Sequence, residues 1–383
     1  MYSNNGKYNL VVTVVAMLLL TTTCRKPYEP AVLISGDNYL VVDGFVNTSF
    51  NGITTIVLSR TKNLIDTVVN IPEHNAKITV QNAAGTTYTL QEQGNDGTYA
   101  SNALQLNNNS QYKILITTAN GRHYTSDLVA ARQTPPVDSV SWRQDSLGVH
   151  VYANTHDPFN STRYYRWTYV QTWEYHAQLE TAWGLAGNVI YVRDPTDQIF
   201  ICYRTTPSTN VLLGTSAALS QDVISMAPLF SIPANDTTLS QRMSIMVKQY
   251  ALTPAAYSYW QIIQKNSEQL GTLFDLQPSQ LEGNIHSLDN SNEPVVGFMS
   301  AGTMEEKRIF ISVFDLQSWR SPRGSYDCTV LDIPQDPNNF SNWTFPDTAY
   351  IPWYFSGGSI RIAKKVCIDC RISGGTTVKP SFW

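Results

Sequence analysis

Residues 163–175 have the sequence Arg-Tyr-Tyr-Arg-Trp-Thr-Tyr-Val-Gln-Thr-Trp-Glu-Tyr. Aromatic side chains recur at alternate positions, and alternate positions of a β-strand lie on one face. The stretch therefore predicts a strand with one almost wholly aromatic face. That face consists of Tyr165, Trp167, Tyr169, Trp173 and Tyr175, with Gln171 interrupting it.

Two interpretations of this aromatic face remain open. Burial is the ordinary reason for such a stripe, because each large aromatic side chain removes about 150–250 Å² from water when it packs in a core. Flat rings also stack on sugars and bases, so the same face is a candidate binding surface. The candidate binding residues are Tyr165, Trp167, Tyr169, Trp173 and, from the C-terminal third, Trp343 and Trp353.

Upstream of this strand, residues 37–132 contain short β-rich runs separated by turn signals such as Ala84-Gly85, Asn95-Asp-Gly97 and Asn120-Gly121. Glycine at these positions supplies the positive φ that tight hairpins require. This spacing of short strands predicts a β-sandwich resembling an immunoglobulin or prealbumin-like module. The runs are Tyr39–Val46, Ile53–Arg60, Ala76–Asn82, Thr86–Gln91, Tyr112–Thr118 and Arg122–Ser126.

The chain is too long for a single hydrophobic core, and Gln133-Thr-Pro-Pro136 marks the expected boundary. Consecutive prolines disfavour helix and cannot donate to a β-ladder, which predicts a stiff junction. We expect residues 137–383 to form a larger β-rich domain with one or a few helices. The whole chain is thus predicted to be mainly β.

One helix in this second part has clear end signals. Thr253 is placed to cap it, Pro254 suits its first turn, and Gly271 is placed to end it. Further along, residues 294–299 and 308–314 are strand-like and are predicted to pair as a hairpin through the segment between them.

The N-terminal segment predicts export. An unbroken apolar block, residues 10–20, is about half the length of the roughly 20 residues that a helix needs to cross a bilayer. Residues 1–23 are therefore expected to be a signal peptide, and residues 24–36 a proline-containing tether.

Cys24 directly follows this signal, as the lipidated cysteine of a bacterial lipoprotein does. We expect acyl chains such as palmitate on Cys24, because several chains hold a protein at a membrane where one chain binds marginally. Thr21 and Thr23 depart from the residues usual at such a processing site. The alternative is an ordinary secretory signal, with Cys24 in a disulfide.

The remaining cysteines lie in the second half of the chain. An even number of cysteines in an exported protein favours disulfides over a redox or zinc pair, and the sequence leaves their connectivity open. The segment 327–355 is rich in Pro, Asn, Trp and Tyr and is predicted to be loop-like. It contains Cys328, precedes Cys367 and is a further candidate binding surface. The disulfide candidates are Cys202, Cys328, Cys367 and Cys370.

The net charge of the chain and the absence of known catalytic motifs restrict the classes of function that the sequence supports. A formal net charge of −4 argues against nucleic acid as a partner. The sequence has no nucleophile elbow, zinc-protease helix, phosphate loop or calcium loop. His150, His156 and His176 flank the aromatic strand but lack the short spacing of metal ligands. We therefore assign no catalytic residue, metal or cofactor.

Several stretches resemble a family of bacterial lipoproteins known as domain of unknown function 4249. The resemblance implies an outer-membrane lipoprotein that is encoded beside TonB-dependent receptors, and it carries over no catalytic residue. The stretches are Tyr39–Val46, Tyr164–Glu174, Val247–Tyr250 with the helix ending at Leu270-Gly271, Gln277–Asn284, Cys367–Arg371, Gly374–Thr376 and Lys379–Trp383.

The expected function is that of an accessory or substrate-capture partner of a TonB-dependent receptor in nutrient uptake, without enzymatic activity. The alternative is a glycan-binding or adhesion lipoprotein at the cell surface, and after it a hydrolase. The expected location is the outer membrane. Its periplasmic or surface side stays open, because Arg25 and Lys26, rather than acidic residues, follow the cysteine.

Overall fold

The computed structural model describes residues 38–61, 71–186, 189–268, 283–319, 327–334, 348–356 and 359–383. The predicted signal peptide, Cys24, the tether, Gly271 and Trp343 lie outside the described residues. Strands make up most of what is described, so the prediction of a mainly β chain is confirmed.

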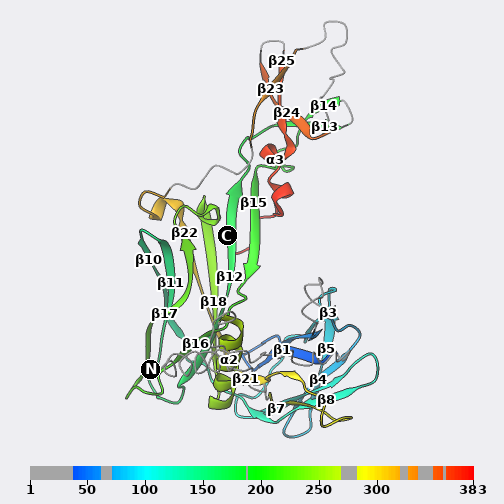
Figure 1. Cartoon of the computed structure of the whole chain (residues 1–383), viewed down its shortest axis with the longest axis vertical. Helices are drawn as coiled ribbons and strands as arrows, with labels where there is room; N and C mark the ends of the chain where they lie inside the picture. The colour runs from blue at the N-terminus through cyan, green and yellow to red at the C-terminus, as the bar shows by residue number, and fades with distance from the viewer. Residues whose placement is uncertain are drawn as a thin grey trace, which may run out of the picture. The chain divides into compact units, whose positions relative to one another are not determined.

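The first sheet takes its strands from two distant parts of the sequence (Figure 1). They are β1 (Leu40–Asn47), β2 (Thr55–Arg60), β3 (Ile71–Pro72), β4 (Lys77–Asn82), β5 (Thr87–Gln93), β6 (Thr98–Ala100), β7 (Gln111–Thr117), β8 (His123–Ser126), β9 (Val129–Ala130), β19 (Ile285–Ser287), β20 (Val296–Gly297) and β21 (Ser300–Gly302). The main path runs β19-β8-β7-β4-β5-β6-β2-β1-β20. Strand β5 pairs with β4 along its first half and with β6 along its second, which lets the sheet fold into two layers.

The core of this sandwich follows from alternation along the strands. In β7, Tyr112, Ile114 and Ile116 are buried, and the residues between them are more exposed. They belong to one core cluster with Leu40 and Ile56 from the other half of the sheet. Burial of such side chains stabilises the fold by about 25 cal/mol for each Å² removed from water. The predicted N-terminal sandwich is therefore confirmed.

Glycines close the turns that the sequence indicates. Gly85, Gly97 and Gly121 have φ of 88°, 78° and 84°. At Gly97 the constraint is steric as well, since a Cβ there would lie 2.2 Å from the carbonyl oxygen of Leu58.

The predicted hairpin of residues 294–299 with 308–314 is wrong. Strands β20 and β21 run parallel to β1 instead, with Val296 beside Val41 and Ser300 beside Phe45. Parallel pairing joins distant segments, so local turn signals do not reveal it. The predicted boundary between residues 37–132 and 137–383 stays a prediction, and the first sheet also includes residues from 285 to 302.

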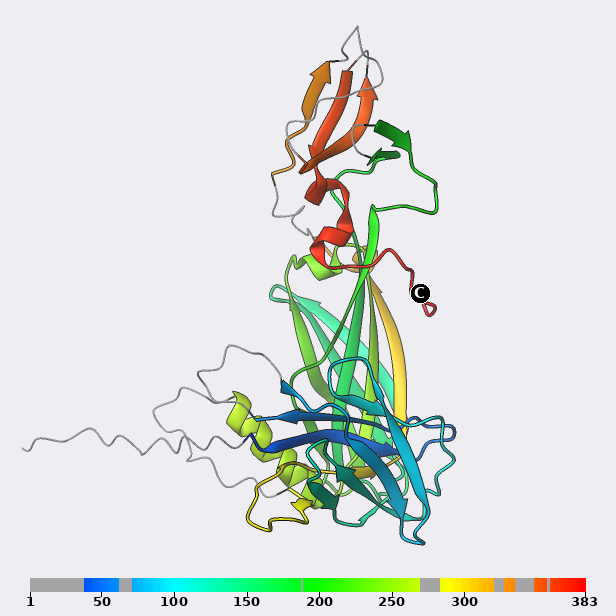
Figure 2. The same ribbon diagram turned by 90° about the vertical axis from the view of Figure 1, so that its right-hand side faces the viewer.

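A second sandwich follows (Figure 2). One sheet has the order β10-β11-β17 and the other β15-β12-β18-β22, with β16 also on β12. Side chains from both sheets form one core cluster, which includes Val151 of β11 and Ile245 of β18. The elements are β10 (Val137–Asp145), β11 (Gly148–Asp157), β12 (Tyr164–His176), β15 (Ile201–Pro207), β16 (Leu212–Thr215), β17 (Asp222–Pro233), η1 (Thr237–Leu239), β18 (Arg242–Ala251), β22 (Met304–Ser312) and η2 (Val313–Asp315).

The C-terminal part is a small disulfide-bonded module. Its elements are β13 (Trp183–Ala186), β14 (Val189–Val192), β23 (Leu331–Pro334), β24 (Tyr350–Ser356), β25 (Ser359–Lys364), α3 (Lys365–Ile368) and η3 (Cys370–Ser373). Cys202 of β15 is bonded to Cys370, and Cys328 to Cys367. All four predicted cysteines therefore form disulfides, and the structure supplies the pairing that the sequence left open.

Helix α2 (Pro254–Glu268) begins as predicted. The hydroxyl of Thr253 accepts a hydrogen bond from the Ala256 N–H at 3.1 Å, which satisfies a backbone donor of the first turn. Ala256 and Tyr259 are buried, and the helix packs against β12 and β16. Within the described ranges, no helix has the length and apolarity needed to cross a membrane.

Gln249 of β18 stabilises the junction between the two sandwiches through side-chain hydrogen bonds. Its side-chain oxygen accepts a hydrogen bond from Trp167 Nε1 at 2.8 Å. Its amide donates to the Pro135 carbonyl at 2.8 Å and to Thr155 Oγ1 at 2.9 Å. Thr134 is buried beside it and donates to the Thr303 carbonyl at 2.5 Å. The junction is therefore fixed by buried hydrogen bonds as well as by proline.

We expect Gln249→Leu to lower the free energy of unfolding by about 2–4 kcal/mol, because it leaves buried donors and acceptors unpaired. Urea unfolding of the purified protein measures this change. The matched control is Gln171→Leu on β12, which is part-exposed and should shift stability by less than about 0.5 kcal/mol. Equal losses in both variants would contradict the role given to Gln249.

Candidate functional site

The aromatic stripe of β12 is core, not a binding surface. Tyr165, Trp167 and Tyr169 are 0%, 1% and 9% exposed and belong to the core of the second sandwich. Tyr165 donates a hydrogen bond to Asp222 at 2.5 Å. Burial and the neighbouring Asp222 carboxylate raise the pKa of Tyr165. The Tyr165 hydroxyl and the Trp167 indole N–H thus have hydrogen-bond partners inside the protein, as buried Tyr and Trp usually do.

The other candidate residues that the structure describes lie against two different clusters. Trp173 is partly buried against the same core, with the Arg204 guanidinium 5.8 Å from its ring centroid. Trp353 packs instead against the C-terminal cluster that contains Cys367. Trp343 lies outside the described residues. The stripe that suggested glycan binding is therefore not a platform.

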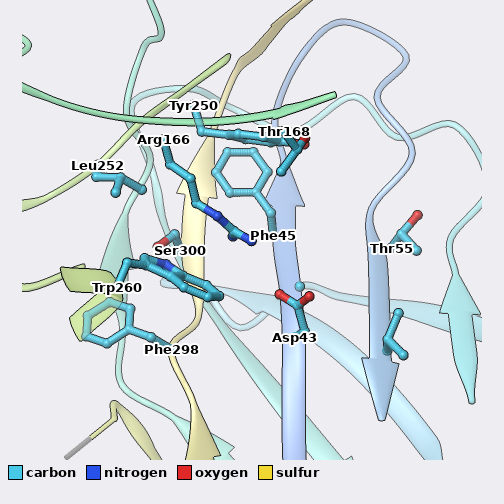
Figure 3. A pocket seen from close by; sticks show the side chains of 12 residues that line it. Asp43, Phe45, Thr55, Arg166, Thr168, Tyr250, Leu252, Trp260, Phe298 and Ser300 are labelled. Carbon is cyan, nitrogen blue, oxygen red and sulfur yellow. The ribbon is translucent and has the colours of Figure 1, made fainter. Parts of the chain in front are cut away.

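A cavity of about 220 Å³ lies where the two sandwiches and α2 meet (Figure 3). One wall of the cavity comes from β1, whose side chains alternate between two faces. Leu40 and Val42 point into the first core, whereas Asp43 is exposed and lines the cavity. The lining residues are Asp43, Gly44, Phe45, Thr55, Val57, Arg166, Thr168, Tyr250, Leu252, Trp260, Phe298 and Ser300.

Arg166 comes from β12 and lies on the face opposite its buried aromatic residues. Its guanidinium carbon is 3.7 Å from the ring centroid of Trp260 on α2. Within the described part of the chain, Arg166 makes no hydrogen bond and no ion pair, and its enclosed Nε has no partner. Burial lowers the pKa of Arg166, while the charges of Asp43 and Tyr250 oppose that shift. Even so, an arginine stays protonated at neutral pH.

Aromatic contacts fix the walls around this cation. Phe45 meets Tyr250 edge-on, with ring centroids 4.9 Å apart. Tyr259 packs against Trp260 at 5.6 Å and against Phe298 at 5.4 Å. Burial raises the pKa of Tyr259 to about 12, so this ring stays neutral. These contacts hold the ring on which Arg166 stacks.

Asp43 lies across the cavity from the arginine. Figure 3 shows the Arg166 side chain directed toward the Asp43 carboxylate, above the Trp260 ring. Among the described residues, no ion pair within 4.0 Å joins Asp43 to a cation. The cavity therefore presents one positive and one negative group, each available to a third partner, between aromatic walls.

The histidines near β12 do not form a metal site. His150, His156 and His176 lie beside different carboxylates, those of Asp145, Asp138 and Glu174. Over the described ranges, the structure contains no group of three or more His, Cys, Asp or Glu side chains placed to hold a metal ion.

The fold and cavity define a mainly β, disulfide-bonded protein with a small charged pocket at the junction of two sandwiches. The model of a family described as "Domain of unknown function (DUF4249)" matches residues 25–308. This match covers more than half of the chain, so the chain belongs to that family, as its sequence resemblance predicts.

Other comparisons add little to this assignment. No curated protein matches the chain. Among solved structures, a two-domain fibronectin type-III segment from chicken tenascin matches with 12% identity and a TM-score of 0.17, covering 56% of this chain and 93% of that chain.

Sequence reasoning missed Arg166, Asp43 and Trp260. A signal was nevertheless present, because Arg166 is a charged residue between two buried aromatics and must lie on the opposite face of the strand. Three stretches that carry the family resemblance, Tyr39–Val46, Tyr164–Glu174 and Val247–Tyr250, each contribute side chains to the cavity.

We expect Arg166→Met to change the free energy of unfolding by less than about 1 kcal/mol, because it removes a desolvated charge without leaving a partner unpaired. Arg60 is the contrast. Its Nε lies 2.7 Å from Glu73, and the two side chains are 9% and 13% exposed. Arg60→Met should cost about 3 kcal/mol. Urea unfolding compares the two, and equal losses would make Arg166 a structural residue.

Proposed function

We propose that this protein is an outer-membrane lipoprotein that captures a small ligand and acts as an accessory to a TonB-dependent receptor. The observation that carries the capture role is the Arg166 cavity, where a half-buried cation lies among aromatic rings and has no hydrogen-bond or ion-pair partner among the described residues. Concave, mostly apolar sites with a few directed polar groups are typical of small-molecule binding.

The disulfides support an extracytoplasmic location. Bonds such as Cys202–Cys370 persist in oxidising compartments and are rare in the cytosol. This agrees with the signal peptide expected over residues 1–23 and with Cys24 as the lipidated residue.

The receptor partnership rests on the family. Members of this family look like lipoproteins encoded beside TonB-dependent receptors, and a capture protein beside such a receptor would raise the local concentration of its cargo. In this role the protein binds and delivers without doing chemistry on the ligand.

Lipidation is tested by metabolic labelling with an alkyne palmitate analogue. We expect label on the wild-type protein and none on Cys24→Ala, which should also leave the membrane fraction, because its acyl chains are the proposed anchor. Cys202 and the other disulfide cysteines carry no label in this account. Persistent labelling of Cys24→Ala would show that Cys24 is not the acylated residue.

Partnership is tested by purifying the tagged full-length protein from its own outer membrane in mild detergent. We expect a TonB-dependent receptor to co-purify in stoichiometric amount, identified by mass spectrometry. A tagged lipoprotein of unrelated fold from the same membrane is the control for nonspecific recovery. Recovery of the protein without any receptor would refute the accessory role.

A further inference from the structure

We propose that the Arg166 cavity binds a small zwitterion with an apolar body, such as an aromatic amino acid, with its carboxylate on Arg166 and its ammonium group toward Asp43. This inference rests on the ligand-capture role proposed above and names the class of ligand. Three features of the cavity favour such a ligand: the free edge of the guanidinium, the balance of charge, and the size and nature of the walls.

The guanidinium is positioned to bind a carboxylate through its edge. Trp260 covers one face of the Arg166 group at 3.7 Å, which orients its plane. In the described structure, its nitrogens donate to no protein acceptor. A planar fork of N–H donors matches the two oxygens of a carboxylate, and such charge-assisted pairs are stronger than neutral hydrogen bonds.

The charge balance favours a ligand with both signs. Asp43 shares the cavity with Arg166, and neither is paired with another charged group in the described ranges. A dianion such as a phosphate would be attracted by one cation and repelled by Asp43. An ammonium group on the ligand would instead be attracted by Asp43, so a zwitterion has a favourable interaction with both charged side chains.

The remaining walls are mainly apolar, with the hydroxyl residues Thr55, Thr168 and Ser300 among them. Phe45 and Tyr250 form an edge-on pair, and Phe298 and Leu252 line the cavity as well. The cavity volume of about 220 Å³ lies below the range of about 300–1,000 Å³ that drug-sized ligands occupy. A molecule the size of a single amino acid with an aromatic or aliphatic side chain fits these dimensions.

Calorimetric titration of the purified full-length lipoprotein in mild detergent tests this assignment. The probes are L-phenylalanine, 3-phenylpropanoate, which lacks the ammonium group, and 2-phenylethylamine, which lacks the carboxylate. We expect L-phenylalanine to bind, and each analogue to bind at least about tenfold more weakly, since each loses one charge-assisted contact.

Two substitutions test which side chain contacts which charged group of the ligand. Arg166→Met should weaken L-phenylalanine binding at least about tenfold. Asp43→Asn should weaken the binding of L-phenylalanine, because its ammonium group loses the Asp43 carboxylate. The same substitution should strengthen the binding of 3-phenylpropanoate, because it removes the repulsion between Asp43 and the ligand carboxylate. The matched control is Arg308→Met, since Arg308 also stacks on a ring, 3.6 Å from the Phe382 centroid, yet lies outside the cavity lining. The Arg308→Met variant should bind L-phenylalanine with the affinity of the wild type.

The outcomes separate this inference from the proposed function. It is overturned if L-phenylalanine, L-tryptophan and L-leucine all fail to bind saturably, or if Arg166→Met binds L-phenylalanine as well as the wild type does. Co-purification of a receptor with no amino-acid binding would overturn only the ligand class. Amino-acid binding without any receptor would refute only the receptor partnership.

Discussion

The two faces of strand β12 constrain the rest of the structure. One face carries Tyr165, Trp167 and Tyr169 into the core of the second sandwich, and this burial fixes how β12 pairs with β18. Since alternate residues must then point the other way, Arg166 is directed to the outside of that sandwich. There it meets β1 and α2 rather than bulk water. Packing of one face thus places the charge on the other.

Packing alone does not explain an arginine at position 166, because its guanidinium is desolvated. A desolvated guanidinium normally has a carboxylate or carbonyl partner, as Arg60 does in Glu73. At Arg166 the attraction of Trp260 offsets part of the desolvation, and no described acceptor supplies the remainder. Residues that reduce stability in this way are typical of binding sites, where a ligand completes the interactions. The same reasoning explains why the cavity retains Asp43 at a distance instead of closing into an ion pair.

The sequence predicted the mainly β chain, the first sandwich, the cap of α2 at Thr253 and the disulfide-bonded cysteines, because these depend on local periodicity, turn chemistry and compartment. It did not predict the cavity, since the approach of β1, β12 and α2 depends on pairings between distant segments. The parallel addition of β20 and β21 to β1 is such a pairing, and local turn signals suggested a hairpin instead. The aromatic stripe was ambiguous for a related reason: whether a face is buried depends on the opposing sheet.

A crystal structure of the full-length protein grown with L-phenylalanine tests the amino-acid site most directly. We predict electron density for the amino acid in the cavity between β1 and α2, with the ligand carboxylate within hydrogen-bond distance of the Arg166 terminal nitrogens and its ammonium group facing Asp43. A structure in which Arg166 and Asp43 pair directly, with the amino acid absent from the cavity, would contradict it.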